Sequence, residues 1–222
     1  MRLALFDLDG TLFPQDSDHA FGEFAIGLGW ADAVEFRRRN DAFFQDYQEG
    51  RLDIHAYVEF ATAPWRDRTP EDLDRAIATF LASVIEPMLT PAARELVLGH
   101  QRAGDLVAVI TATNDFVTRP IAHLLGVDEL IATDLARDVS GRITGRIAGV
   151  PCFREGKVER LRSWLAARGL SLGDFELSTF YSDSTNDLPL LECVSHPVAT
   201  NPGPALARIA QDRGWPVLKL FA

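Results

Sequence analysis

Short apolar runs alternate with longer segments of helical periodicity along most of the chain. The runs have the length and the branched or aromatic content of buried strands. We expect strands at Leu3–Phe6, Leu106–Thr111, Leu130–Ala132, Thr179–Ser182 and Val194–Ala199, with Pro216–Leu220 at an edge. Strands that alternate with helices form a mostly parallel sheet covered on both faces. The pattern predicts an α/β fold with a doubly wound, Rossmann-like core.

Residues 15–86 follow a different pattern, because they contain no convincing strand and their apolar positions recur at helical spacing. One such set is Phe21, Phe24, Ala25 and Leu28. Glycine and proline residues divide the stretch into four predicted helices. A helical segment inserted between the first two strands is a candidate lid over the active crevice. We therefore expect a core of residues 1–14 and 87–222, with residues 15–86 as a helical cap.

Two further patterns concern smaller parts of the chain. Between Val139 and Val150, a Ser140-Gly141 turn signal and alternating apolar residues predict a small β-hairpin beside the sheet. The predicted cap is rich in aromatic residues. These form either the core of the helices themselves or, for Phe43, Phe44 and Tyr47, a wall of the substrate pocket.

Net charge, apolar content and cysteine count limit the kinds of molecule that this chain is expected to bind and the compartment in which it is expected to work. The formal charge of -10 and the pI of about 4.9 disfavour binding to nucleic acid or anionic membranes. No apolar run approaches the roughly 18 residues that span a bilayer, and the chain begins without a signal-peptide pattern, so we expect a cytoplasmic protein. Cys152 and Cys193 are expected to be free thiols. The sequence leaves the oligomeric state open.

The first candidate for chemistry is the motif that follows the first predicted strand, from Asp7 through Asp9 and Gly10 to Thr11. Carboxylates at the carboxyl end of a parallel strand point into the crevice where such sheets bind ligands. A pair of like charges needs a cation between them, and hard Mg²⁺ prefers oxygen ligands. A carboxylate can also attack phosphorus. The alternative is a polar turn in which an aspartate caps the next helix.

Two other segments offer groups that suit a phosphate. Thr111 to Asp115 ends the second predicted strand and opens a helix, whose free N–H groups can cradle an anion. Lys157 lies at a helix start, where a cation opposes the helix dipole and therefore lacks a stabilising role. The plain alternatives are an ordinary helix cap and an exposed lysine.

The second strong motif follows the predicted strand Thr179–Ser182 and contains Asp183, Asn186 and Asp187. Asp183 comes directly after this strand, as Asp7 does after the first, so the two carboxylates can face one another. Asp187 lies four residues later and can reach back along the first helical turn. An Asx turn with a capped helix explains one of these aspartates but not both.

Together these motifs resemble the haloacid dehalogenase superfamily, in the branch that includes phosphoserine phosphatase-like enzymes. The resemblance covers the whole chain and includes the segments Gly141–Gly145, Tyr181–Ser184 and Asn201-Pro202. It implies that Asp7 is the nucleophile and a Mg²⁺ ligand. Asp9 would be the general acid/base and would give its carbonyl to the metal. Asp183 would complete the metal site, and Asp187 would support it.

The same resemblance implies a binding site for the substrate. Thr111 and the N–H of Ala112 would hold phosphoryl oxygens, and Lys157 would join Asp7 to the phosphoryl group. The other residues expected on the substrate-binding side are Thr11, Asp16, Thr113 and Asn186. The expected activity is Mg²⁺-dependent hydrolysis of a small phosphorylated metabolite through an aspartyl-phosphate. A phosphotransferase or mutase would use the same groups, and a non-enzymatic phospho-receiver module is a more distant alternative.

The sequence also restricts the substrate. Asp16 lies nine residues after Asp7, where phosphoserine phosphatases carry an acidic side chain that recognises the substrate amine. Those enzymes place an arginine for the carboxylate in the cap, but Ala61 falls at about that position and residues 53–65 contain no lysine or arginine. The sequence therefore favours a phosphorylated amine without a carboxylate, such as an amino-alcohol phosphate, over phosphoserine.

Overall fold

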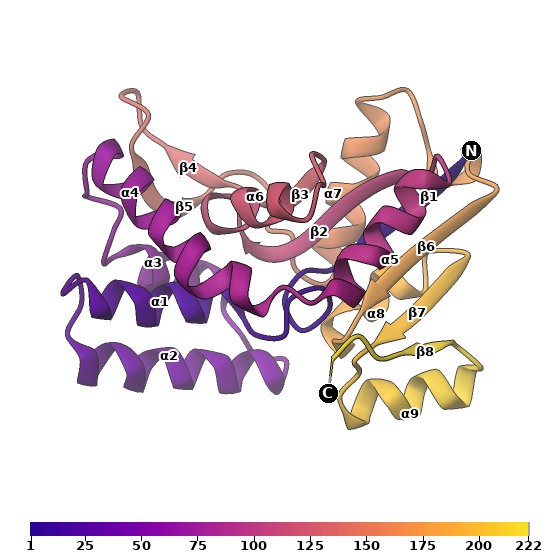
Figure 1. The fold of residues 1–222 in the computed structure, drawn as a ribbon, viewed down its shortest axis with the longest axis horizontal. Coiled ribbons are helices and arrows are strands. Elements are labelled where there is room, and N and C mark those ends of the chain that lie inside the picture. Colours follow the sequence, from indigo (N-terminus) through magenta and orange to yellow (C-terminus); the bar gives the residue numbers. More distant parts are fainter. Residues whose placement is uncertain (222) are drawn as a thin grey trace.

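The computed structural model describes residues 1–221, which fold around a central parallel sheet (Figure 1). Its strands are β1 (Arg2–Phe6), β2 (Leu106–Asn114), β3 (Leu130–Thr133), β6 (Leu177–Ser182), β7 (His196–Thr200) and β8 (Val217–Leu218). Their order is β3-β2-β1-β6-β7-β8, and each neighbouring pair runs parallel. The chain moves outward from β1 in one direction and then crosses to its other side. The doubly wound fold predicted from the apolar runs is confirmed, with β8 at an edge.

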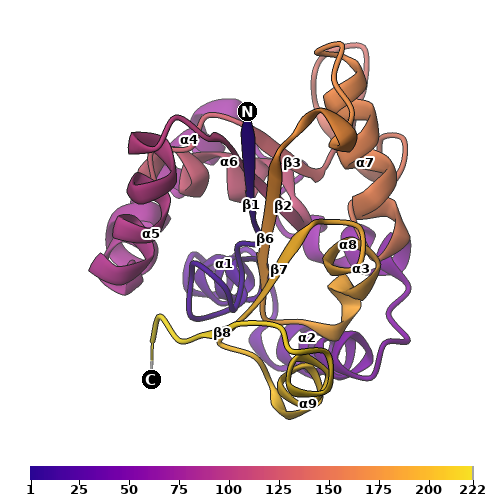
Figure 2. The ribbon, with the colours of Figure 1, turned by 90° about the vertical axis from the view of Figure 1, so that its right-hand side faces the viewer.

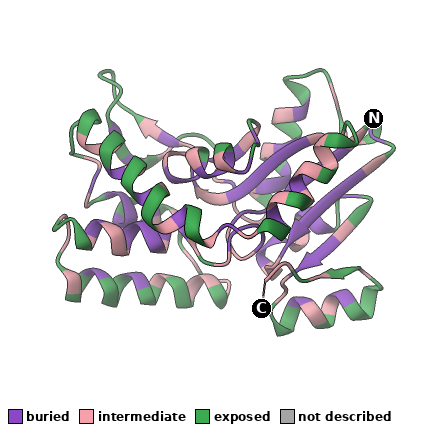
Figure 3. Ribbon diagram, viewed as in Figure 1, coloured by how far each residue is buried: buried purple, intermediate pink, exposed green. Residues whose placement is uncertain are grey.

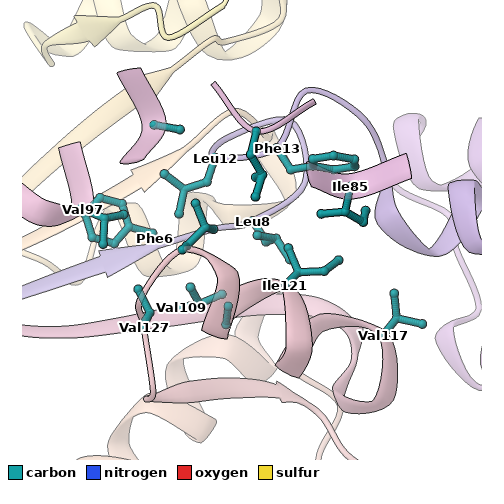
Figure 4. Packing of buried hydrophobic residues seen from close by; sticks show 14 of the residues in the cluster. Phe6, Leu8, Leu12, Phe13, Ile85, Val97, Val109, Val117, Ile121 and Val127 are labelled. Atoms are coloured by element: carbon teal, nitrogen blue, oxygen red, sulfur yellow. The ribbon is translucent and has the colours of Figure 1, made fainter. Parts of the chain in front are cut away.

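Helices cover both faces of this sheet (Figure 2). On one face lie α5 (Pro91–Arg102) and α6 (Asp115–Leu124), and on the other lie α7 (Glu155–Ala166), α8 (Leu188–Leu191) and α9 (Pro204–Arg213). Alternate residues of a strand point to opposite faces. Phe6 therefore joins the cluster beneath α5 and α6 (Figure 4), while Leu5 joins the cluster beneath α7. The strands are buried along most of their length, and exposed residues lie mainly on the helices and loops (Figure 3).

Residues 17–80 form the four helices that the periodicity predicted. They are α1 (Ser17–Gly27), α2 (Ala33–Gln48), α3 (Ile54–Thr62) and α4 (Pro70–Phe80), followed by a π turn (Leu81–Ile85) and a 3-10 turn (Glu86–Met88). Each helix begins at a side-chain cap that accepts a hydrogen bond from its first turn. The capping residues are Asp16, Asp32, Asp53 and Thr69.

The aromatic residues of these helices divide between two cores. Phe36 and Phe60, with Phe43 and Tyr57 packed against them, form a small core of the helices themselves. Phe21 and Trp65 pack against Phe116 of α6, with ring centroids 6.1 and 4.6 Å apart respectively. Both belong to the same buried cluster as Phe6 of β1. One part of the apolar surface of the helical segment is therefore continuous with one face of the sheet.

The predicted β-hairpin is present but begins earlier than the sequence indicated. Its strands, β4 (Leu135–Arg137) and β5 (Ile143–Ile147), are antiparallel. The Asp138 carboxylate accepts hydrogen bonds from the backbone N–H groups of Ser140 and Arg142, which fixes the turn there. The first strand must therefore precede Asp138 and lies outside the expected range of 139–150. β5 packs against α3.

Several strand boundaries also differ from those expected: β6 begins two residues earlier, at Leu177, and β8 is shorter. Two other differences have a clear cause. β2 continues to Asn114 because it resumes pairing with β3 after a register shift, through Asn114 and Thr133. β7 starts at His196 rather than at Val194, because the N–H of Ser195 donates to the Ser178 side chain instead of joining the strand ladder. Within residues 1–221 no single helix is long and apolar enough to cross a membrane, although Pro70–Met88 and Pro91–Arg102, bent by 94°, reach that length together.

Candidate active site

The predicted site residues meet where the chain crosses from one half of the sheet to the other. β1 lies between β2 and β6, and the loops that follow these three strands leave the sheet at the same edge. The loops after β1 and β6 carry Asp7 and Asp9, and Asp183 to Asp187, while Thr111 to Thr113 lie at the end of β2 itself. Open α/β sheets bind ligands at such a switch point, because the adjacent loops diverge there and leave a crevice.

A buried lysine joins two of the carboxylates. The Nζ atom of Lys157 donates to Asp7 Oδ1 at 2.8 Å and to Asp187 Oδ2 at 2.7 Å, and only 2% of the Lys157 side chain is exposed. Ser182 Oγ donates to the same Asp187 oxygen at 2.7 Å. Burial opposes a charged lysine, but the carboxylates of Asp187 and Asp7 hold the Lys157 pKa well above its ordinary value. The ammonium is therefore retained at the base of the site.

Asp7 and Asp183 approach one another across a shared threonine. Thr11 Oγ1 lies 3.4 Å from Asp7 Oδ2 and 3.2 Å from Asp183 Oδ1, and it accepts a hydrogen bond from the Asp183 N–H. Gly10 allows this approach, because a Cβ there would come within 2.3 Å of Asp183 Oδ2 and the residue has a φ of +73°. Burial and the charge of Asp7 raise the Asp183 pKa well above its ordinary value.

These carboxylates fit a hard divalent cation. Burial also raises the Asp7 pKa, to about 6, although Lys157 opposes the shift. The positive charge around Asp7 and Asp183 is therefore too small to keep their pKa values in the ordinary range. In the described residues no group of three or more His, Cys, Asp or Glu side chains is placed to hold a metal ion. The ligands implied by the family resemblance include just two side chains, Asp7 and Asp183, together with the main-chain carbonyl of Asp9.

The Asp9 carboxylate is held by two donors. The N–H of Ser17 donates to Oδ1 at 2.8 Å and Thr113 Oγ1 donates to Oδ2 at 2.8 Å. These contacts come from the start of α1 and the end of β2, so Asp9 is oriented by two segments far apart in sequence. Burial, Asp16 and Asp7 all raise the Asp9 pKa. The protonated form, which a general acid needs, is thereby favoured.

Above this centre lies a cavity of about 220 Å³. One end is lined by Asp7, Asp9, Asp183 and the segment Thr111–Thr113. The other end is lined by Gln15, Asp16 and apolar or aromatic side chains of the helical segment, which are Phe43, Phe44, Tyr47, Leu52, Ile54 and Tyr57. Phe43, Phe44 and Tyr47 thus form part of the wall, as one interpretation of the sequence held.

No lysine or arginine lines this cavity in the part of the chain that the structure describes. Arginines of the helical segment are engaged elsewhere: Arg37 with Glu23, Arg38 with Glu35, Arg51 with Asp46, Arg39 over the Phe60 ring, and Arg66 beside Gly145. Asp16 accepts the His19 N–H at 2.8 Å as the cap of α1 and also faces the cavity. The end of the cavity lined by Asp16 and the helical segment, called the organic end below, is therefore acidic and largely apolar. Burial raises the Asp16 pKa there, and the His19 N–H opposes the shift.

Four of the expected residues lie outside the cavity wall. Thr11 lies between Asp7 and Asp183. Lys157 and Asp187 lie behind Asp7, as described above. Asn186 donates to the Tyr47 carbonyl at 3.1 Å and accepts from Arg154 Nε at 3.3 Å. Arg154 also donates to the Gly50 carbonyl, so this group of contacts fastens the carboxyl end of α2 to the sheet core.

The sequence did not indicate several residues that shape the site. Arg154 was not predicted to have a role, nor was the Ser17 N–H, because contacts between distant segments leave no periodic signal. Tyr57 is not distinguished by the sequence from the other aromatic residues of the helical segment, yet it lines the cavity. Asp18 was also missed, although it is a buried carboxylate with 6% exposure. Its position two residues after the Asp16 cap was the one available signal.

Comparisons with known proteins find a matching family and matching folds. Residues 4–192 match the family of haloacid dehalogenase-like hydrolases. The chain is 46% identical over 217 residues to a histidinol-phosphatase of Neisseria meningitidis, covering 98% of each chain. It also resembles a solved Bordetella pertussis protein of unknown function, with 52% identity, a TM-score of 0.93 and 99% coverage of both chains. A substrate-bound phosphoserine phosphatase shares the fold at 22% identity, with a TM-score of 0.67 and coverage of 97% of this chain and 91% of that one.

Proposed function

The chain belongs to the haloacid dehalogenase-like hydrolases and is a phosphatase, and we propose that its substrate is histidinol phosphate, an amino-alcohol phosphate. The observation that carries the proposal is the charge of the cavity. Its organic end presents Asp16 between aromatic walls, and among residues 1–221 no cationic side chain lines it. This end complements a ligand that carries both an ammonium group and an aromatic ring.

Histidinol phosphate matches this cavity at both ends. Its phosphate meets the Asp7 and Thr111 end, its amine can pair with Asp16, and its flat imidazole suits the walls formed by Phe43 and Phe44. Phosphoserine carries a carboxylate that would be buried beside Asp16 without a cation, at a desolvation penalty of several kcal/mol. The name of the Neisseria relative, which matches along nearly its full length, supports the same substrate.

We further propose that Asp7 and Asp9 carry out hydrolysis in two steps. An Asp7 carboxylate oxygen attacks phosphorus, the ester bond breaks, and Asp9 gives its proton to the leaving alkoxide. Asp9 then removes a proton from water, which attacks the aspartyl-phosphate and releases inorganic phosphate. Lys157 and the N–H groups after Thr111 stabilise the charge on the phosphoryl oxygens. Mg²⁺, held by Asp7, Asp183 and the Asp9 carbonyl, would supply further positive charge there.

The substrate is tested by comparing kcat/KM for histidinol phosphate, phosphoethanolamine and phosphoserine. We expect histidinol phosphate to be preferred by at least about tenfold, because the alternatives lose ring contacts or bring an unpaired carboxylate. A preference for phosphoserine would overturn the proposal. Product analysis with excess glycerol checks the reaction itself: transfer of phosphate to glycerol instead of water would favour the phosphotransferase alternative.

The metal requirement is a separate prediction. We expect activity to disappear in excess chelator and to return with Mg²⁺ but not with Ca²⁺. The larger ion takes more oxygen ligands at longer distances and relaxes the octahedral geometry that aligns the reacting groups. The measurement is the initial rate of phosphate release at saturating ion concentration. Full activity in chelator would show that Asp7, Asp9 and Asp183 do not bind a catalytic metal.

A further inference from the structure

The turn that follows β1 is held from outside the cavity by a side chain at the end of β7. Asn201 directly follows β7, and its Nδ2 donates to the carbonyl oxygens of Gly10 and Thr11 at 3.0 Å each. Its Oδ1 accepts the Leu220 N–H at 2.7 Å, and its own N–H donates to the Leu218 carbonyl at 2.7 Å. An amide turned the other way would place its oxygen against two carbonyls and its NH₂ against an N–H, so the contacts fix this orientation.

The backbone of Asn201 has a conformation that most residues avoid. Its φ is +47°, and within residues 1–221 the other non-glycine residue with a positive φ is Arg154. Pro202 follows, and a residue before proline prefers an extended conformation with a negative φ. Glycine would adopt the observed φ at less cost, although asparagine tolerates it better than most residues. Such a conformation persists where surrounding contacts require it, and here these are the hydrogen bonds of Asn201 to both the β1 turn and the C-terminal segment.

The two carbonyls that Asn201 holds belong to the residues on which the carboxylate spacing depends. Thr11 Oγ1 lies 3.4 Å from Asp7 Oδ2 and 3.2 Å from Asp183 Oδ1. Gly10 packs so closely against the Asp183 carboxylate that a Cβ would not fit there. In the described residues neither carbonyl accepts a hydrogen bond from a backbone N–H, so the Asn201 amide supplies their donors. A shift of this turn would therefore change the distance between Asp7 and Asp183.

We propose that Asn201 is a positioning residue that sets the spacing of Asp7 and Asp183 through the turn at Gly10 and Thr11. The proposal rests on the proposed metal site, in which these two carboxylates hold a divalent cation. Removing a group that orients metal ligands without touching the metal typically costs about 10–100-fold in metal affinity or activity. Asn201 does not line the cavity, so its effect reaches the substrate only through the ligands that it positions.

Two substitutions separate the parts of this contact. Asn201→Gly permits the positive φ and removes the whole side chain. Asn201→Asp keeps an oxygen that accepts the Leu220 N–H, but it places a second oxygen, in place of Nδ2, against the two carbonyls of the turn. The matched control is Ser195→Ala at the opposite end of β7. Ser195 Oγ accepts the Ser178 N–H at 2.9 Å, so this variant also removes a hydrogen bond that joins two segments, but away from the site.

Metal binding to the metal-free protein is measured with Mn²⁺, which prefers the same oxygen ligands as Mg²⁺ and whose unbound fraction gives an electron paramagnetic resonance signal. We expect the Kd for Mn²⁺ to rise about 10–100-fold in both Asn201 variants and to stay within about twofold in Ser195→Ala. Urea unfolding followed by circular dichroism accompanies each titration. A merely structural role would lower the unfolding midpoint and leave the Kd of the folded protein unchanged.

The outcomes distinguish the role of Asn201 from the metal site itself. A wild-type Kd in both Asn201 variants would overturn the positioning role and leave the metal site in place. An effect confined to Asn201→Gly would overturn the role of the Nδ2 donors, because Asn201→Asp lacks these donors too. If metal-free wild type binds no Mn²⁺, the proposed metal site is wrong and the role of Asn201 falls with it.

Discussion

Lys157 shows at the scale of a single residue how the site is held together. Its ammonium lies between Asp7 and Asp187 at 2.8 and 2.7 Å, with little solvent to screen the charges. Removing one partner from such a buried set leaves an uncompensated charge, which is costly. The geometry therefore requires both the charge and the compact shape of a lysine.

Exchanging Lys157 for arginine tests this requirement. Lys157→Arg keeps the charge, but the planar guanidinium is bulkier than an ammonium and does not fit between two carboxylates at these distances. We expect kcat to fall by about 10²-fold or more. Steady-state kinetics with a thermal unfolding curve separates this loss from misfolding. Normal turnover would remove Lys157 from the reaction.

Asp7 is the residue on which the proposed chemistry depends. Asp7→Asn preserves the shape and can still accept from Lys157, but it removes the nucleophilic negative charge. We expect kcat to fall by at least about 10³-fold, with the fold intact by circular dichroism. A variant that retains a tenth of the wild-type rate would exclude Asp7 as the nucleophile.

At the scale of elements, the start of α7 places Lys157. Arg154, the residue before α7, has a φ of 53°, which is uncommon for a residue other than glycine. Its side-chain contacts to Gly50 and Asn186 hold the backbone in this conformation. Gly156 packs so closely that a Cβ would come within 2.1 Å of the Pro151 carbonyl oxygen. The position of the helix, and with it that of Lys157, depends on this contact.

A methyl group at Gly156 should displace the helix. We expect Gly156→Ala to lower the free energy of unfolding by about 1–3 kcal/mol and to reduce kcat by about tenfold or more, because Lys157 moves with α7. The matched control is Gly99→Ala in α5, where a Cβ meets nothing within 4 Å. That variant should gain about 0.5–1 kcal/mol in stability and keep its activity. Equal behaviour of the two variants in urea unfolding and kinetics would contradict the packing argument.

At the scale of the whole molecule, the helical segment and the sheet share one apolar core. Phe21, Trp65 and Phe80 of that segment belong to the same buried cluster as Phe6 and Val109 of the sheet. The segment cannot withdraw fully without exposing this surface to water. Any motion of a lid is therefore expected to involve only part of the helical segment.

This shared core predicts one cooperative unfolding transition. Although chains of this length often unfold in stages, separating the helical segment from the sheet would expose the apolar residues of both. We expect urea unfolding followed by far-UV circular dichroism and by tryptophan fluorescence to give the same midpoint. The four tryptophans report on both parts, since Trp30 and Trp65 lie in the helical segment and Trp164 and Trp215 pack against the sheet core. Two separated midpoints would show that residues 15–86 fold as an independent unit.

The sequence by itself determined the strand pattern, the helical insertion and the residues at the ends of β1, β2 and β6. These follow from local periodicity and from the rule that parallel strands present their carboxyl ends at one edge. Through its resemblance to phosphoserine phosphatases it also indicated that Asp16 lies on the substrate side, and Asp16 does line the cavity.

Tertiary structure alone decided which distant side chains meet. Nothing local in the sequence distinguishes Tyr57 from the packing aromatics of its helix, or indicates that Asp18 bonds to Asn114, 96 residues away. The hairpin register was equally hidden, since Asp138 fixes the turn through its own side chain. Periodicity reports which side of an element is apolar, whereas the partner of a buried polar group depends on how the elements pack.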